Sequence, residues 1–116
     1  NGFVADSVGE SNIFRGMVAA PGTVTLDGGR ALQVRSDRPA GTKVGVLMRP
    51  ERFAPSGVNA FTGEVFESVY LGTSFKLRLA CDGGLELLVR QPARGALPAA
   101  GAKVTVGIDP ESIHVF

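Results

Sequence analysis

The most reactive side chains in this sequence are those of one cysteine, Cys81, and one histidine, His114. A catalytic thiol or hydroxyl needs a base within hydrogen-bond reach, and a metal site needs several such ligands together. Cys81 continues the apolar face of an alternating run at 75–79, which favours a small buried side chain. His114 alternates with two aliphatic neighbours, which favours the outer face of a terminal strand. The sequence therefore predicts neither a catalytic pair nor a transition-metal site.

Two glycine-containing stretches invite comparison with phosphate-binding loops, "GGRALQVRS" at 28–36 and "GTKVGVL" at 41–47. A phosphate loop needs glycines followed by Lys and Ser or Thr at fixed spacing, because backbone amides and an ammonium group must converge on the phosphate oxygens. Neither stretch has that spacing. The sequence therefore predicts that this segment is not an enzyme and binds no ATP or other cofactor of its own.

Two glutamates follow prolines directly after alternating runs, Glu51 after Pro50 and Glu111 after Pro110. Proline suits the first position of a helical turn, and glutamate complements the exposed N–H groups of that turn. The simplest interpretation is a short turn that ends a strand. The alternative is a polar contact point for a partner domain, because the first copy, "MRPER", adds Arg49 and Arg52, whereas the second copy, "IDPES", keeps only acidic residues.

Nucleic-acid binding is not favoured by either charge or aromatic content. Twelve basic residues stand against eleven acidic ones, for a net charge of +1, so no basic groove is indicated. Phe66, Tyr70 and Phe75 could in principle stack on bases, but Glu64 and Glu67 lie among them. Core packing is the simpler role for these aromatic residues.

The elements that must position these residues are strands. Half-buried strands bury every second residue, and this alternation occurs in three long runs and two shorter ones, at 74–81, 103–109, 43–49, 85–90 and 31–35. Two "DGG" tripeptides, at 27–29 and 82–84, stand between alternating runs, where glycine supplies the positive φ of a hairpin turn. The sequence therefore predicts an all-β domain.

The chain also contains an internal repeat. "NIFRGMV" matches "NAFTGEV", "DGGRALQVR" matches "DGGLELLVR", and "GTKV" with "RPE" matches "GAKV" with "DPE". The offset between the copies grows, so the second copy carries insertions near "ESVYLGTS" and in "PARGALPAAG", both expected to be loops. Each copy has the size of a small OB-type barrel. We expect two OB-like barrels, residues 1–53 and 54–116, in an arrangement that allows them to exchange a strand.

Four segments in order resemble a known family: "FVADSVGESNIFRG", "VLMRPERF", "GEVFESVYLGTSFKLRL" and "VTVGIDPESIHVF". They are similar to the transport-associated OB (TOBE) domain, the C-terminal regulatory domain of ATP-binding subunits of ABC importers. The resemblance covers essentially the whole chain. It is closest to the group of spermidine/putrescine, ferric iron and sulfate-type importers, and within that group to the polyamine type.

The resemblance implies a regulatory and dimerisation function for a piece of a longer chain. The N-terminal domain of the parent subunit would bind ATP and Mg²⁺ and hydrolyse the ATP. The implied partners are that ATPase domain, a second copy of the subunit and, through the parent, the membrane permease subunits, with no nucleic acid. The implied location is peripheral, on the cytoplasmic side of the inner or plasma membrane. The transported substrate and any regulatory ligand are left open.

The resemblance marks three motifs as fold or interface candidates rather than as a catalytic set. The residues are Glu10 and Asn12 in "GESN", Arg49, Pro50 and Glu51 in "RPE", and Glu67, Tyr70, Leu71 and Gly72 in "ESVYLG".

Oxyanion binding is the alternative function. Small molybdate-binding domains share the doubled-barrel plan and carry a Ser-Ala-Arg-Asn segment where this chain reads "GESN", with Glu10 and no arginine. A carboxylate beside an oxyanion costs about 1 kcal/mol or more through like-charge repulsion, depending on burial. The second copy, "SGVN", also lacks the arginine, so we rank this function below the regulatory one.

Overall fold

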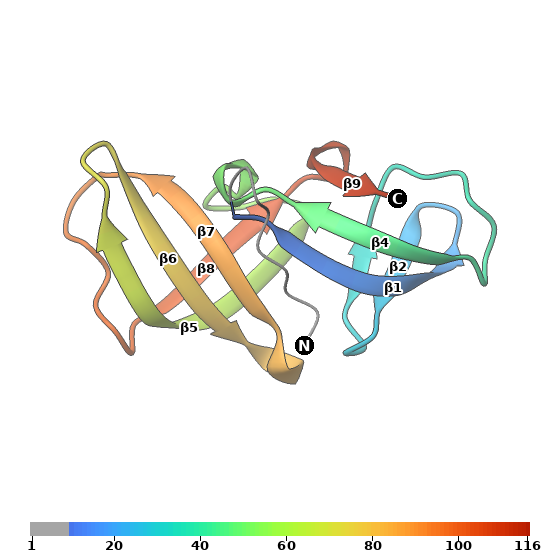
Figure 1. Cartoon of the computed structure of the whole chain (residues 1–116), viewed down its shortest axis with the longest axis horizontal. Helices are drawn as coiled ribbons and strands as arrows, with labels where there is room; N and C mark the ends of the chain where they lie inside the picture. Colours follow the sequence, from blue (N-terminus) through green and yellow to red (C-terminus); the bar gives the residue numbers. More distant parts are fainter. Residues whose placement is uncertain (1–9) are drawn as a thin grey trace.

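The computed structural model describes residues 10–116, which form nine strands and three single turns of 3₁₀ helix (Figure 1). No α-helix occurs within this range. The first sheet, in spatial order, consists of β3 (Ala31–Gln33), β2 (Thr23–Leu26), β1 (Asn12–Ala20), β4 (Lys43–Met48) and β9 (Ile113–Val115). The second consists of β7 (Glu86–Pro92), β6 (Ser74–Cys81), β5 (Asn59–Tyr70) and β8 (Lys103–Ile108). The short turns are η1 (Pro50–Arg52), η2 (Asp82–Gly84) and η3 (Pro110–Ser112).

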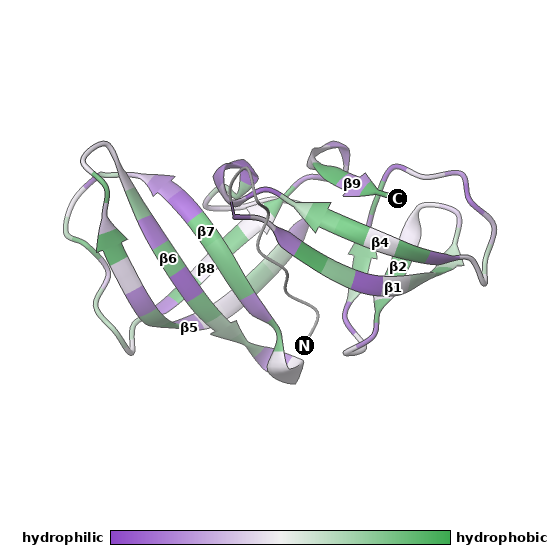
Figure 2. Cartoon of the chain, viewed as in Figure 1, coloured by the Kyte–Doolittle hydropathy of each residue, from purple (hydrophilic) through white to green (hydrophobic). Residues whose placement is uncertain are grey.

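Both sheets are antiparallel and curl around one continuous apolar core. Residues on β6 alternate between hydrophobic and hydrophilic in Figure 2, and Phe75, Leu77 and Leu79 are the buried members of that strand. They join Phe14 and Val46 from the first sheet in the same core. The molecule measures 44 × 26 × 25 Å, so the two curled sheets lie side by side along the long axis. The predicted all-β class with two OB-like half-barrels is confirmed.

The two "DGG" tripeptides form hairpin turns as predicted. The first links β2 to β3, and Leu26 N–H donates to the Arg30 carbonyl at 2.8 Å. The second links β6 to β7, and Cys81 N–H donates to the Leu85 carbonyl at 2.7 Å. Gly83 and Gly84, each with φ of 75°, supply the left-handed backbone that the second turn requires.

One of the two expected loop insertions is instead a strand. The segment Glu67–Tyr70 pairs with β6 after a bulge between Val65 and Glu67, so β5 continues to Tyr70. The insertion near "ESVYLGTS" therefore lengthens the β5–β6 hairpin, because its residues pair with β6 as part of the same antiparallel ladder. The insertion at 93–102 is a loop, as expected.

The two halves exchange their terminal segments. Strand β9 follows η3 in the second copy but pairs with β4 of the first sheet, with His114 opposite Leu47. In return, Ala54, which follows η1, bridges Gly107 of β8 through two reciprocal hydrogen bonds of 2.8 Å. The "PE" turns are therefore the points at which the chain crosses from one half to the other.

Candidate functional site

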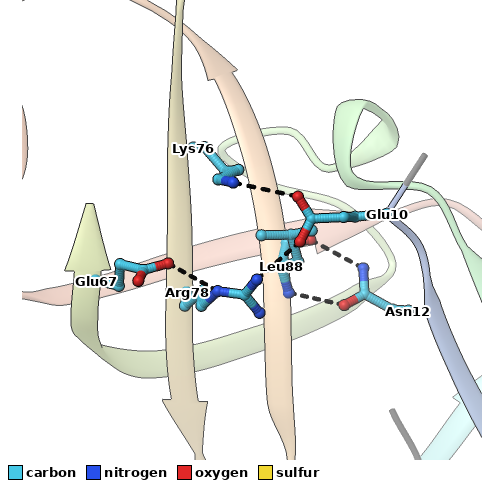
Figure 3. Close-up of polar contacts among 6 residues, drawn as sticks. All are labelled: Glu10, Asn12, Glu67, Lys76, Arg78 and Leu88. Carbon is cyan, nitrogen blue, oxygen red and sulfur yellow. Dashed lines mark hydrogen bonds and ion pairs between the residues drawn. The ribbon is translucent and has the colours of Figure 1, made fainter. Parts of the chain in front are cut away.

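The junction between the halves is built around two buried asparagines. In Figure 3 Asn12, at the start of β1, reaches β7 of the other sheet. Its Nδ2 group donates to the carbonyls of Met48 and Leu88, both at 2.9 Å, and its Oδ1 accepts from Leu88 N–H at 2.7 Å. Asn12 is fully buried, so this amide connects its own half to the other half with all of its donors used.

Asn59 makes the matching contacts from the second half. Its Nδ2 group donates to the carbonyls of Ile108, at 3.1 Å, and Gln33, at 2.9 Å. Its Oδ1 accepts from Gln33 N–H at 2.7 Å. Asn12 and Asn59, like Gln33 and Leu88, stand at equivalent positions of the sequence repeat. The two asparagines therefore form a reciprocal clamp, which we call the asparagine clamp.

A cluster of four charged side chains lies over this clamp (Figure 3). The Glu10 carboxylate accepts from Lys76 Nζ at 3.2 Å and from Arg78 Nη2 at 2.7 Å. Arg78 Nε also donates to Glu67 Oε1 at 2.8 Å. Lys76 and Arg78 are two residues apart on β6, so both point from its outer face toward Glu10. We call Glu10, Glu67, Lys76 and Arg78 the junction cluster.

The environment of Glu10 favours its ionised form. The hydrogen bond from Lys76, together with the positive charges of Lys76 and Arg78, lowers the pKa of the Glu10 carboxyl, against a smaller opposing effect of burial. Glu10 therefore carries a negative charge at neutral pH and forms ion pairs with Lys76 and Arg78 of β6.

The "RPE" turn meets the "GESN" segment beside the junction cluster. Arg49 Nη1 donates to Ser11 Oγ at 3.5 Å, and η1 packs against β7. Together they border a hollow of about 230 Å³, lined by Glu10, Arg49, Pro50, Glu51, Lys76, Leu88 and Arg90. The nearest predicted members of the two motifs, Asn12 and Arg49, are 37 residues apart in sequence, and the fold brings the motifs together.

Three of the nine predicted residues lie elsewhere, at the tip of the β5–β6 hairpin. Tyr70 and Leu71 are exposed, with 61% and 45% of their surface accessible, and the Tyr70 ring packs 6.1 Å from the Phe75 ring. Gly72 has φ of 94°, which only glycine adopts easily. The structure thus gathers Glu10, Asn12, Arg49, Pro50, Glu51 and Glu67 at the junction and places Tyr70, Leu71 and Gly72 at the hairpin tip.

The environments of Cys81 and His114 are those of packing side chains. Cys81 ends β6 in the second sheet, and His114 lies on β9 at the edge of the first sheet. Burial raises the pKa of the Cys81 thiol, which keeps it protonated. The exposed His114 ring stacks on Phe116 at 5.7 Å.

Among residues 10–116, no group of three or more His, Cys, Asp or Glu side chains could hold a metal ion. Over the same range, no helix has the length and apolar character needed to cross a lipid bilayer.

Sequence reasoning missed three basic residues of structural importance. Lys76 and Arg78 alternate with the buried residues of β6, which marks them only as outward-facing, and their partner Glu10 is 66 and 68 residues away in sequence. Arg30 lies with Cζ 4.1 Å from the centre of the Phe61 ring and donates to the Ala60 carbonyl. The difference between "DGGR" and "DGGL" in the two copies is the only sequence signal that points to Arg30.

Two curated relatives match the whole chain. The spermidine/putrescine import ATP-binding protein PotA of Acetivibrio thermocellus is 30% identical over 118 residues, and that of Bacteroides thetaiotaomicron is 33% identical over 119 residues. The chain spans 32% and 25% of the length of these relatives. It is therefore similar to one part of each of them.

A solved structure shares the fold. The cytoplasmic molybdate-binding protein ModG, crystallised with molybdate bound, superposes with a TM-score of 0.75 over 90% of this chain and 94% of that one. At 18% identity, this match speaks for the doubled-barrel architecture alone. The model of the TOBE domain family matches residues 46–116, which include the "RPE" turn, the whole second sheet and β9. The predicted resemblance is confirmed, and the chain belongs to the TOBE domain family.

Proposed function

We propose that this domain is the regulatory and dimerisation module of the ATP-binding subunit of an ABC importer. The observation that carries the proposal is the similarity of the whole chain to two import ATP-binding proteins, combined with membership of the TOBE family. The names of both relatives specify spermidine and putrescine, so a polyamine is the proposed cargo. ATP and Mg²⁺ would then be bound by another part of the parent subunit, which would contact the permease on the cytoplasmic side of the membrane.

A rigid junction suits this function. A module that keeps two ATPase subunits paired must hold them in a fixed relative position, so its own two halves must not bend relative to each other. The asparagine clamp ties β1 to β7 and β5 to β3, and the exchanged segments add two further links. Bending at the junction would break several buried hydrogen bonds together, and each broken bond leaves a costly unpaired group.

The proposed contact with a second copy is the tip of the β5–β6 hairpin. Phe66 and Tyr70 lie on the last part of β5 and Leu71 follows directly; these side chains expose 47%, 61% and 45% of their surface, respectively. Exposed aromatic and aliphatic side chains of this kind are typical anchors of protein interfaces. A two-fold contact would place the two tips against each other.

Sedimentation velocity on the full-length subunit tests this contact. The double variant Tyr70→Ser/Leu71→Ser should weaken the dimer by at least about tenfold, because it removes two interface anchors. Met17→Ser is the matched control, since Met17 is 44% exposed but lies on the first sheet. Equal dimer affinities for the double variant and the control would exclude the hairpin tip as the interface.

Oxyanion binding remains a second candidate, favoured by the fold shared with a molybdate-binding protein. The junction cluster opposes it, because Glu10 and Glu67 together balance the charges of Lys76 and Arg78, and their carboxylates would repel an anion. Isothermal titration of the chain with molybdate and tungstate should give no saturable heat. Saturable binding of either anion at micromolar concentration would favour this second function over the regulatory one.

A further inference from the structure

The two "DGG" turns meet each other where the halves join. A Cβ atom built on Gly28 would lie 3.4 Å from the Gly83 carbonyl oxygen, and one built on Gly83 would lie 3.4 Å from the Gly28 carbonyl oxygen. These distances are equal because Gly28 and Gly83 hold equivalent positions of the repeat. The two turns are therefore related by a local two-fold axis at this contact. The residue that follows each turn, Arg30 or Leu85, lies in an equivalent position on either side of the axis.

On one side, the chain fills the site with its own arginine. The Arg30 guanidinium lies 4.1 Å from the centre of the Phe61 ring. Its Nη2 group donates to the Ala60 carbonyl, and its Nε group donates to the Ala31 carbonyl at 3.3 Å. A cation over an aromatic ring, with carbonyl acceptors at its edge, is a favourable site for a planar guanidinium.

On the other side, the equivalent of Arg30 is Leu85, which has no charged end. The backbone is alike at both places, because Leu26 N–H donates to the Arg30 carbonyl and Cys81 N–H donates to the Leu85 carbonyl. The equivalents of Phe61 and Ala60 are Phe14 and Ile13. The two sites therefore differ mainly in the side chain that enters them.

A hollow of about 540 Å³ occupies this second site. Its apolar lining comes from Ile13, Phe14, Leu26 and Leu85, and Gly28, Gly83 and Gly84 complete its backbone walls. Its ionisable lining consists of Asp27 and Asp82, one from each turn, together with Arg15 and Arg30. The lining therefore holds two carboxylates and two guanidinium groups, and the guanidinium of Arg30 is engaged with Ala60 and Phe61.

We infer that this hollow is a binding site for a guanidinium group, which it takes from outside the chain. The incoming group lies at the edge of Phe14, 6% of whose surface is accessible, with the Ile13 carbonyl as acceptor and Asp27 and Asp82 as counter-charges. The chain's own Arg30 is thus the template for the ligand. A primary ammonium would fit less well, because it is more strongly hydrated and cannot stack as a plane.

Nuclear magnetic resonance titration of the chain with n-butylguanidinium tests this inference, with n-butylammonium as the control that has the same alkyl chain and charge. We expect saturable amide shifts at residues 13–15 and 82–85 and binding at least about threefold tighter for the guanidinium. Absence of saturable shifts there, or equal binding of both cations, would overturn the inference.

Two reciprocal variants make the test independent of general charge effects. Leu85→Arg supplies an internal guanidinium, so it should abolish binding while leaving the melting temperature unchanged or higher. Leu85→Met, which keeps an apolar side chain, should still bind. Arg30→Leu empties the first site and should raise the stoichiometry from one to two. Unchanged binding to a folded Leu85→Arg variant would overturn the inference.

A last comparison identifies the source of the guanidinium. The capped tripeptide Gly-Arg-Gly presents an arginine as a partner protein would, and Gly-Lys-Gly is its matched control. Tighter binding of the arginine peptide than of n-butylguanidinium assigns the site to a protein partner. Tighter binding of n-butylguanidinium assigns it to a small molecule.

Discussion

At the scale of single residues, Asn12 and Asn59 place a polar amide in an otherwise apolar junction. Burying an amide is costly unless its hydrogen bonds are made, and both asparagines make three with good geometry. An apolar residue at either position would leave backbone groups of the opposite half without partners. The residue type is therefore dictated by the backbone that it joins.

Asn12→Ala should lower the free energy of unfolding by about 2–3 kcal/mol, because Leu88 N–H and two buried carbonyls lose their partner. Asn59→Ala should have a similar effect through Gln33. Urea unfolding followed by circular dichroism gives both values. Thr62→Ala, which removes an exposed hydroxyl contact with Thr105, is the control and should cost less than about 0.5 kcal/mol.

Glu10→Gln should show the charge dependence of the junction cluster. The folded state lowers the pKa of Glu10, so its carboxylate adds stability above the unfolded value of about 4.3. That contribution is lost as the pH falls through the folded pKa. Because the cluster is partly exposed, the wild-type advantage at pH 7 should be no more than about 1 kcal/mol. Urea unfolding of both proteins between pH 3 and 7 measures it, and a pH-independent difference would contradict the assigned role.

At the scale of elements, each "PE" turn delivers the following segment to the opposite half. Ala54 reaches β8 and β9 reaches β4, so each turn fixes a crossing point as well as ending a strand. Both crossings run beside a glycine. Gly107 lies against the backbone of Gly57, whereas Gly45 lies under the ring of Phe116.

Gly107→Ala should therefore be more destabilising than Gly45→Ala. A methyl group at 107 would collide with backbone atoms of residues 56 and 57, which cannot move without breaking the Ala54 bridge. A methyl group at 45 would meet the exposed ring of Phe116, which can turn aside. We expect losses of about 3 kcal/mol and about 1 kcal/mol in thermal or urea unfolding. The reverse order would contradict the crossing geometry.

The sequence predicts the elements well because alternation and glycine turns are local signals. It predicts β6, β8, both "DGG" hairpins and both short turns for that reason. It fails where strand pairing over a distance decides, as at Glu67–Tyr70, which look like an insertion but extend β5 along β6. The pairing of Glu10 with Lys76 and Arg78 was likewise beyond local patterns, since it depends on how two halves meet.

At the scale of the whole molecule, the duplication gives two half-barrels that depend on each other. The core is continuous across both sheets, and each asparagine protects a backbone amide of the opposite sheet. A single cooperative unfolding transition is the expected consequence, because neither half keeps its full set of partners alone.

Hydrogen exchange should reveal this crosswise dependence. Asn12→Ala should speed exchange of the Leu88 amide in the second sheet, and Asn59→Ala should speed that of Gln33 in the first. Each variant serves as the control for the other. Faster exchange confined to the mutated half would indicate that the halves are independent.

The proposed function rests on this locked domain holding two ATP-binding subunits together. Sedimentation velocity of the full-length subunit, with and without residues 10–116, measures that most directly. We expect the intact subunit to form a dimer, and removal of the domain should raise the dissociation constant of that dimer by at least about tenfold. A dimer of unchanged affinity after removal would contradict it.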